Sequence, residues 1–149
     1  MRLKLRALKQ AARLPKQATS KSFGYDLVTT AHTTIMPRGT EILPTSLKLA
    51  QDLPMEPDAS VGLAMLILPR SSLPLKYGLI VANSPGLIDA DYTGEIGIIV
   101  YNIRDKIQHI EAGTRIAQAV FVEAFFPEMV WADAVDERPD RGGFGSTGK

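Results

Sequence analysis

Residues 83–101 read NSPGLIDADYTGEIGIIVY, a turn-rich segment followed by a short and strongly apolar run. The β-branched run at 96–101 is typical of a strand, and the proline and glycine before it favour a turn. Asp89 therefore lies in a loop beside a strand. A carboxylate in such a loop could hold and deprotonate a water molecule when a substrate lies against it. Tyr92 and Gly94 add an aromatic surface and a flexible backbone position.

The same pattern of short apolar runs between turn residues repeats along the chain. The runs occupy residues 42–49, 61–68, 79–81, 96–101, 107–110 and 116–122. Long helical periodicity is absent, and only residues 71–77 favour a short helix, which Pro74 limits to one or two turns. The pattern predicts an all-β domain of the sandwich, barrel or jelly-roll kind.

The composition excludes several classes of protein. A chain of 149 residues fits one domain, and a net charge of +1 gives no reason to expect binding to nucleic acid or to an anionic membrane. The absence of cysteine excludes disulfides and thiol catalysis. His32 and His109 lie in unrelated segments, so a zinc-dependent deaminase with a His/Cys/Cys site is excluded.

The N-terminus is basic, since every charged residue before Asp26 is a lysine or an arginine. Such a run occurs in transit peptides and in arms that bind nucleic acid. Here Leu3 and Leu5 alternate with basic residues, which is the period of a half-exposed strand and favours a charged edge strand. No apolar run has the length of a secretory core or a membrane span. We therefore expect a cytoplasmic protein.

The C-terminal end has the composition of a mobile tail, so we expect a domain at residues 1–135 and a glycine-rich arm at 136–149. The ending GFGSTGK matches the phosphate-loop pattern. That match is rejected because the chain ends at the lysine, without the hydroxyl residue and helix that must follow. The glycine N–H groups and hydroxyls could still bind phosphate, and Phe144 could lie on a base. A disordered tail is the alternative.

Three polar motifs near strand ends can each be interpreted in two ways. Arg70 and Ser71 offer donors for phosphate oxygens, yet the pair is also typical of a helix cap beside a surface arginine. Asn83 can donate and accept hydrogen bonds, as a pyrimidine edge demands, or it belongs to an ordinary β-turn. Gln118 could contact a phosphate or a metal-bound water, or it is a structural polar residue. No single motif decides the function.

In their order along the chain, five motifs resemble those of the homotrimeric dUTPases. They are Gly24-Tyr25-Asp26-Leu27, Pro69-Arg70-Ser71-Ser72-Leu73, the segment 83–95, Arg115-Ile116-Ala117-Gln118, and the tail Gly143-Phe144-Gly145-Ser146-Thr147-Gly148. The resemblance covers nearly the whole chain from about Leu14. The segment 83–95 and the tail are its most specific parts.

The resemblance implies an all-β fold, a distorted β-sandwich or jelly roll of the β-clip kind, assembled as a homotrimer with a flexible C-terminal arm. Each site would take its phosphate-contacting motifs from one chain, a uracil-recognising hairpin from a second and the arm from a third. The implied reaction is hydrolysis of dUTP to dUMP and pyrophosphate with Mg²⁺ as cofactor. That reaction limits uracil incorporation into DNA and supplies dUMP for dTMP synthesis.

The resemblance also implies a role for each matching position. Asp89 would deprotonate the water that attacks the α-phosphorus, and Tyr92 would pack under the deoxyribose. The substrate phosphates would hold the metal, while Asp26 and Gln118 would contact its water molecules or the phosphates. The residues implied to bind the substrate are Arg70, Ser71, Ser72, Asn83, Gly86, Leu87, Ile88, Asp89, Tyr92, Gly97, Gln118, Arg141, Phe144, Gly145, Ser146 and Thr147.

Three departures from the family pattern stand out. Ser72 replaces a usual glycine, and its side chain could crowd the phosphates or help to hold them. Only two glycines separate Arg141 from Phe144, so either Arg141 or Arg138 serves the arm. Gly97 stands where the family often has a longer side chain. None of these positions is the proposed base.

Two relatives and one unrelated class are the alternatives. A zinc-free dCTP deaminase on the same fold would read cytosine and would need a glutamate as its base, whereas Asp89, Tyr92 and Phe144 favour the pyrophosphatase. A nucleotide-binding regulatory protein on the same fold could keep every motif. A structural jelly-roll protein, such as a capsid subunit, would explain the strands but not the ordered polar motifs.

Overall fold

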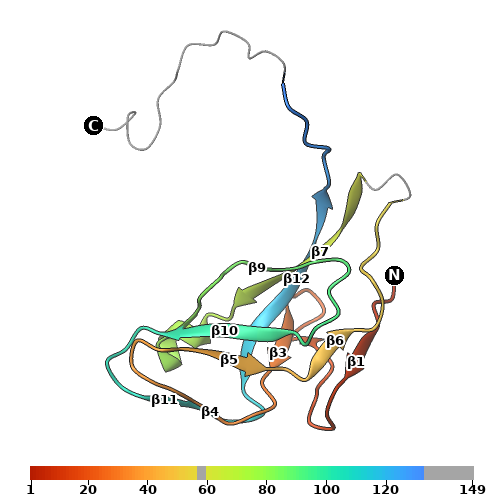
Figure 1. The fold of residues 1–149 in the computed structure, drawn as a ribbon. Coiled ribbons are helices and arrows are strands. Elements are labelled where there is room, and N and C mark those ends of the chain that lie inside the picture. Colours follow the sequence, from red (N-terminus) through yellow and green to blue (C-terminus); the bar gives the residue numbers. More distant parts are fainter. Residues whose placement is uncertain (57–59, 133–149) are drawn as a thin grey trace.

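The computed structural model describes residues 1–56 and 60–132, which form an almost entirely β structure (Figure 1). In chain order the elements are β1 (Leu5–Ala7), β2 (Lys16–Gln17), β3 (Tyr25–Val28), β4 (Thr33–Ile35), β5 (Thr40–Pro44), β6 (Leu47–Leu49), β7 (Val61–Pro69), η1 (Leu73–Tyr77), β8 (Leu79–Val81), β9 (Gly86–Ile88), β10 (Gly97–Asn102), β11 (Gln108–Ile110) and β12 (Arg115–Phe125). The expected all-β fold is confirmed.

Two sheets and two ribbons make up the fold. The larger sheet has the strand order β2-β3-β12-β7-β9 and the smaller one the order β5-β10-β8. The ribbons are β1-β6 and β11-β4. The long strands β7 and β12 pair antiparallel from Ala117 opposite Pro69 to Phe125 opposite Val61, and they form the spine of the molecule.

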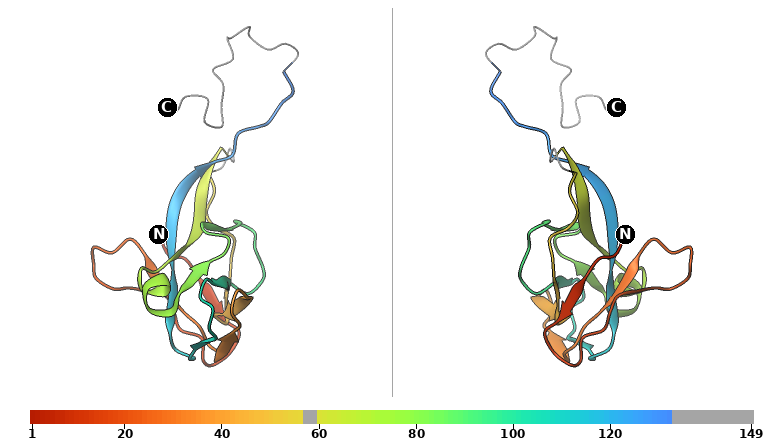
Figure 2. Two further views of the ribbon diagram at one scale, coloured as in Figure 1. Left: turned by 90° about the vertical axis from the view of Figure 1, so that its left-hand side faces the viewer. Right: turned by 90° about the vertical axis from the view of Figure 1, so that its right-hand side faces the viewer.

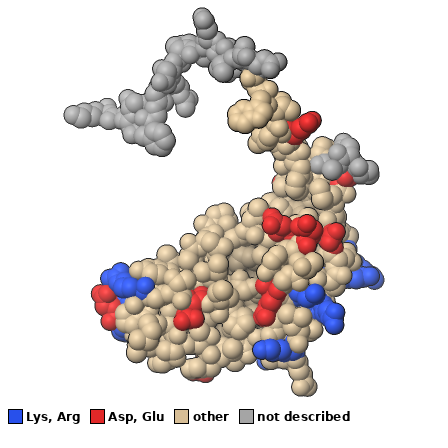
Figure 3. Space-filling model, in the orientation of Figure 1, with Lys and Arg blue, Asp and Glu red and all other residues tan. Residues whose placement is uncertain are grey.

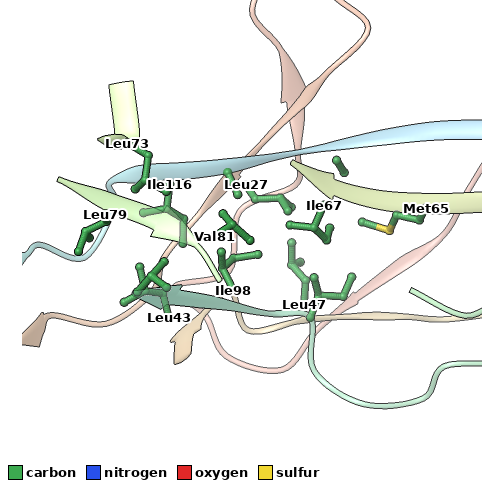
Figure 4. Close-up of a cluster of buried hydrophobic side chains, with 14 of the residues drawn as sticks. Leu27, Leu43, Leu47, Met65, Ile67, Leu73, Leu79, Val81, Ile98 and Ile116 are labelled. Carbon is green, nitrogen blue, oxygen red and sulfur yellow. The ribbon is translucent and has the colours of Figure 1, made fainter. Parts of the chain in front are cut away.

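The core lies between the two sheets. Leu27, Ile67 and Ile116 point from the larger sheet toward Val81 and Ile98 of the smaller one (Figure 4). All five side chains are buried. Strands β8 and β10 bury alternate residues, as expected for strands with one face on the core. Each side chain of this size adds about 1.5–3 kcal/mol of stability when fully buried.

The apolar runs located most of the long strands, with one correction. The runs at 61–68, 96–101 and 116–122 correspond to β7, β10 and β12. The run at 42–49 is not one strand, because the chain turns at Ser46, which has a positive φ of 54°. It therefore forms β5 in the smaller sheet and β6 in a ribbon with β1.

The segment 83–95 connects β8 to β10, which pair antiparallel, but β9 inside the segment does not pair with β10. Strand β9 pairs with β7, whereas β10 pairs with β5 and β8. Strands β9 and β10 thus belong to different sheets, and the loop between them, residues 89–96, crosses from one sheet to the other (Figures 1 and 2). We call it the crossing loop.

The short helix expected at 71–77 forms as one turn, η1, of the π type, with Ser72 as its N-cap. The Ser72 side chain makes no capping hydrogen bond. Gly78 ends the turn with a φ of 62°, and its N–H donates to the carbonyl oxygens of Leu73 and Pro74. Glycine suits this left-handed backbone position.

After β12 the chain leaves the body of the molecule (Figure 1). Residues 126–132 are exposed, among them Met129 and Trp131. The expected arm at 136–149 lies outside the described residues. No helix in the described ranges is long and apolar enough to cross a membrane.

Candidate active site

Four polar side chains from separate parts of the chain meet on the larger sheet. In the pairing of β12 with β3, Gln118 lies opposite Asp26, so the two side chains share one face. Strand β7 pairs with β12 at the edge that faces away from β3, and Leu68 of β7 lies opposite Gln118. Arg70 directly follows β7. Arg115 begins β12 and reaches Asp26. We call Asp26, Arg70, Arg115 and Gln118 the charged cluster.

Asp26 holds two arginines at once. Arg70 Nη1 donates to Asp26 Oδ1, and Arg115 Nη1 donates to Asp26 Oδ2 at 3.1 Å. The side chain of Asp26 is 11% exposed, that of Arg70 23% and that of Arg115 57%. Burial lowers the pKa of Arg70, and the positive charge of Arg115 lowers it further. Arg70 still remains charged at neutral pH, so the cluster suits an anion.

Gln118 makes one hydrogen bond, and its position depends on the absence of a side chain at Gly24. Its Nε2 donates to the carbonyl oxygen of Pro69 at 3.1 Å. Its Oε1 accepts no hydrogen bond within the described residues and lies over Gly24, where an added Cβ would overlap it. Glycine at position 24 is thus what leaves room for the Gln118 amide.

Ser71 and Ser72 lie between the charged cluster and η1. Ser71 is exposed and Ser72 is half-buried with φ −68° and ψ −21°, an ordinary right-handed conformation. A non-glycine residue is therefore unstrained at position 72. The departure from the family pattern at this position needs no backbone adjustment.

Strand β9 and the turn before it carry the residues expected to read the base. Gly86 lets the Asn83 amide approach the backbone, since a Cβ added at Gly86 would lie 3.2 Å from Asn83 Nδ2. Leu87 points outward and is 60% exposed, whereas Ile88 packs against the core. Because β9 lies at the edge of the sheet, part of its backbone donors and acceptors face outward.

Asp89 lies at the start of the crossing loop with an exposed side chain. The N–H of Tyr92 donates to the carbonyl oxygen of Asp89 at 3.1 Å, and the Tyr92 hydroxyl donates to that of Glu95 at 3.0 Å. A Cβ added at Gly94 would overlap the Tyr92 hydroxyl. The orientation of the Tyr92 ring therefore depends on glycine at position 94.

The crossing loop is fastened to the chain before β7. The Glu95 carboxylate accepts from the N–H of Ser46 at 2.6 Å, and the N–H of Leu53 donates to the carbonyl oxygen of Ala90 at 2.8 Å. On the face drawn in Figure 3, acidic side chains gather near the end of β9 and basic ones near β1 and β6. The loop is thus a positioned segment with an acidic surface.

Gly97 begins β10 and faces outward beside Ile42 of β5. A Cβ added at Gly97 would lie 2.7 Å from Ile42 Cγ2, and Ile42 is 62% exposed. The Ile42 side chain occupies the space that a longer residue at position 97 would fill.

One chain does not bring Asp89 and the charged cluster together. Gly86 pairs with Ile67, and the two strands then run in opposite directions, toward Asp89 and toward Arg70. At about 3.3 Å per residue, the Cα atoms of Arg70 and Asp89 lie roughly 20 Å apart. The Arg70 guanidinium also turns toward β3, away from β9. Among the described residues no hydrogen bond or ion pair links the two groups.

Sequence reasoning named Gly94 as a flexible backbone position and quoted Gly24 and Glu95 within motifs, but it missed what these three residues do in the site. Gly24, Gly94 and Glu95 each hold another site residue in place, but their contacts depend on tertiary structure and carry no signal in the sequence alone. Arg115 belonged to a quoted motif, yet it was given no role. The expected arm residues Arg138, Arg141, Phe144, Gly145, Ser146 and Thr147 lie outside the described residues.

Comparison with known families and proteins gives one consistent result. The dUTPase family model matches residues 10–148. The deoxyuridine 5'-triphosphate nucleotidohydrolase of Hydrogenobaculum sp. is 43% identical over 150 residues, with 99% of each chain covered. The protein of the same name from Picosynechococcus sp. is 40% identical over 149 residues, again with 99% of each chain covered.

Solved structures are similar as well. A dUTPase of Staphylococcus bacteriophage 80alpha, solved with dUPNHPP, superposes with a TM-score of 0.81 at 25% identity, and 99% of each chain is covered. A variant dUTPase from phage phi11 of S. aureus, whose structure describes the coordination of a structural Mg(II) ion, has a TM-score of 0.77 at 22% identity. That match covers 90% of this chain and 98% of the phage protein.

Proposed function

The chain belongs to the dUTPase family, and from that premise we propose how its residues divide the work of the reaction. The protein is a dUTP diphosphatase, which hydrolyses dUTP to dUMP and pyrophosphate. The proposal assigns the attacking water and the nucleoside to the segment 83–95, and the triphosphate to Arg70, Ser71 and Ser72, with Asp26 and Gln118 beside them.

Asp89 is the general base. Its carboxylate is exposed at the start of the crossing loop, where it can accept a proton from a water molecule. The water then attacks the α-phosphorus, and pyrophosphate leaves. Positioning and charge neutralisation dominate the catalysis of such reactions, so no covalent nucleophile is needed.

Arg70 and the two serines that follow it bind the phosphates. Arg70 supplies a charged donor, and Ser71 and Ser72 supply hydroxyl and backbone donors at the start of η1. The guanidinium is already oriented by Asp26, so less conformational entropy is lost on binding. A preorganised cation of this kind stabilises negative charge on the transferring phosphoryl group.

Recognition of the nucleoside falls to Asn83, to the backbone at Leu87 and Ile88, and to Tyr92. The Asn83 amide and the edge backbone of β9 offer donors and acceptors to a pyrimidine edge. The Tyr92 ring, fixed by Glu95, packs under deoxyribose and leaves no room for a 2′-hydroxyl. Gly97 lies near the base.

We propose that Mg²⁺ is held by the substrate phosphates. In the parts of the chain that the structure describes, no group of three or more His, Asp or Glu side chains could hold a metal ion. The free amide oxygen of Gln118 and the remaining lone pairs of Asp26 suit hydrogen bonds from metal-bound water. When bound, the ion neutralises charge on the triphosphate.

We propose that the protein is a homotrimer with shared sites. The supporting observation is the separation of roughly 20 Å between Arg70 and Asp89 at about 3.3 Å per residue, because a base and its phosphate-binding residues must meet at one phosphorus. A neighbouring chain resolves this separation by bringing its own charged cluster to the crossing loop.

A mixing experiment tests the shared site. Asp89→Asn and Arg70→Gln chains, each expected to turn over dUTP far more slowly than the wild type, are unfolded together and refolded as a 1:1 mixture. If the two residues come from different chains, about one quarter of the sites regain both native residues in a cyclic oligomer. Pyrophosphate release from dUTP should recover accordingly. Refolded mixtures without any recovery would show that one chain supplies both residues.

The C-terminal arm is proposed to close the site, with Phe144 over the base, Gly145 beside it, and Ser146, Thr147 and Arg141 or Arg138 at the γ-phosphate. Deleting residues 136–149 should leave the oligomer folded but remove most turnover. Unimpaired hydrolysis by this truncated chain would refute the arm's role.

We also propose a cytoplasmic location, which cell fractionation tests.

The overall activity is tested with a substrate panel. Pyrophosphate release with Mg²⁺ is measured for dUTP, dTTP, dCTP and UTP. We expect release from dUTP alone. Ammonia from dCTP would instead indicate the deaminase alternative, and no turnover of any substrate would favour a nucleotide-binding regulatory protein.

A further inference from the structure

Arg115 is oriented by an irregularity in its strand. Arg115 pairs with Val28 and Ala117 with Leu27, so Ile116 is an extra residue without a partner, a β-bulge. In a regular strand Arg115 would share the face of Ala117, which lies against the core with Leu27. The bulge turns Arg115 onto the opposite face of the strand.

The face reached by Arg115 is the one that carries the charged cluster. Val28 and Asp26 are two residues apart on β3 and therefore share a face. Gln118 lies opposite Asp26 on this face, and Arg115 Nη1 bonds Asp26 Oδ2 at 3.1 Å. Bulges often re-aim a side chain next to an active site. The bulge thus brings a second cation to Asp26, which already holds Arg70.

The second cation exceeds what Asp26 needs for neutralisation. Asp26 carries one negative charge against the two positive charges of Arg70 and Arg115. Arg115 makes a single hydrogen bond within the described residues, and its side chain is 57% exposed. A guanidinium has five N–H donors, so most of those on Arg115 remain available. This surplus of charge and donors faces outward beside Arg70.

We propose that Arg115 is a second phosphate-binding residue of the site and that Asp26 is the positioning residue that holds both arginines. The proposal rests on the proposed function, because the anion is the triphosphate of dUTP. Arg115 binds phosphate oxygens with the donors that Asp26 leaves free. Asp26 fixes the spacing and orientation of the two guanidinium groups through one carboxylate oxygen each.

The experiment compares two ligands in one variant. Arg115→Gln removes the positive charge and the planar set of guanidinium N–H donors but keeps a polar side chain. Binding of a non-hydrolysable imido analogue of dUTP and of deoxyuridine is measured by calorimetry with Mg²⁺. We expect affinity for the analogue to fall about tenfold or more, since a charge-assisted contact is lost. Affinity for deoxyuridine should stay unchanged.

Further variants separate binding from folding. Arg115→Lys keeps the charge but not the planar guanidinium donors, so its loss of affinity for the analogue should be smaller. This variant provides the test if Arg115→Gln does not fold. Arg38→Gln is the matched control, because it removes an exposed arginine paired with Asp105 on another part of the surface. Asp26→Asn should weaken binding of the analogue more than that of deoxyuridine.

The outcomes distinguish this inference from the activity on which it rests. Equal losses for both ligands, or an unchanged affinity for the analogue, would overturn the role of Arg115 while wild-type turnover of dUTP stayed intact. Absence of wild-type turnover would instead refute the proposed function. A loss confined to the analogue supports the assignment.

Discussion

The charged cluster and the crossing loop are built by opposite means. The cluster is assembled by strand register, which sets Gln118 opposite Asp26 and brings Arg70 and Arg115 to the same carboxylate. The loop has no strand pairing, and backbone hydrogen bonds and the absence of a side chain at Gly94 set its shape. The arrangement of the charged cluster depends on ion pairs between side chains of a regular sheet. The shape of the crossing loop depends on how its irregular backbone packs.

Because of this difference, substitutions in the two regions should have different effects on the site. Loss of a charge in the cluster should weaken binding of phosphate and leave the backbone in place. Loss of fit in the loop should move Asp89 and Tyr92 together, because both belong to the same turn. Substitutions in the two regions should therefore differ in whether they change KM or kcat.

The largest effect is expected from Asp89→Asn. The amide keeps the shape of the side chain but cannot accept the proton, so kcat should fall about 10²–10⁴-fold. Binding of an imido analogue of dUTP should be retained. Steady-state kinetics and calorimetry measure the two quantities. Wild-type turnover by this variant would show that the base lies elsewhere.

A paired glycine substitution compares the two regions directly. Gly94→Ala pushes against the Tyr92 hydroxyl, and Gly24→Ala pushes against Gln118 Oε1. Because a misplacement of about 1 Å can reduce turnover by up to 10²-fold, Gly94→Ala should mainly lower kcat. Gly24→Ala should mainly raise KM, since the flexible Gln118 can turn aside and lose its bond to Pro69.

The kinetic constants of both variants are measured with dUTP, and their thermal unfolding is measured alongside. Both chains should unfold near the wild-type temperature, because neither glycine has a positive φ. Identical changes of kcat and KM in the two variants would contradict the distinction between the regions.

A smaller effect is expected from Glu95→Gln. The amide can still accept from the N–H of Ser46, but the hydrogen bond is no longer charge-assisted. The loss of stability should be about 1 kcal/mol. Chemical denaturation measures this loss, and Glu41→Gln on the exposed part of β5 serves as the control. No difference between the two variants would show that Glu95 does not fasten the loop.

Ser72→Gly should have the smallest effect. Ser72 has ordinary right-handed angles and makes no capping hydrogen bond, so glycine removes only a free hydroxyl and adds backbone freedom. We expect a loss of stability of up to about 1 kcal/mol and a small rise in KM, because one of the hydroxyl donors to phosphate is lost. A large gain in kcat/KM would show that the serine side chain crowds the phosphates.

The sequence predicted the apolar strands, including the short β8 and β11, and missed short strands such as β3 and β4 that contain polar residues. Apolar runs identified β7, β10 and β12, because buried strands must be apolar over several residues. Strands β3 and β4 were missed, since each is short and contains polar residues. Their places come from pairing with distant strands, which no local pattern carries.

The site was predicted residue by residue, but its geometry was not. Motif resemblance selected Asp26, Arg70, Asp89 and Gln118. The pairing of Asp26 with two arginines depends on the register of β3 against β12 and on an extra residue in β12. Likewise, the distance between Arg70 and Asp89 follows from the pairing of β9 with β7 rather than with β10.

The bulge at Ile116 restricts how the motif Arg115-Ile116-Ala117-Gln118 can be built into another protein. A protein engineer who grafts Arg115 and Gln118 onto a regular strand would place them on opposite faces, because their separation of three residues is odd. Only the unpaired residue between Arg115 and Ala117 brings the two side chains to one face. The spacing of the motif, and not only its composition, must therefore be copied.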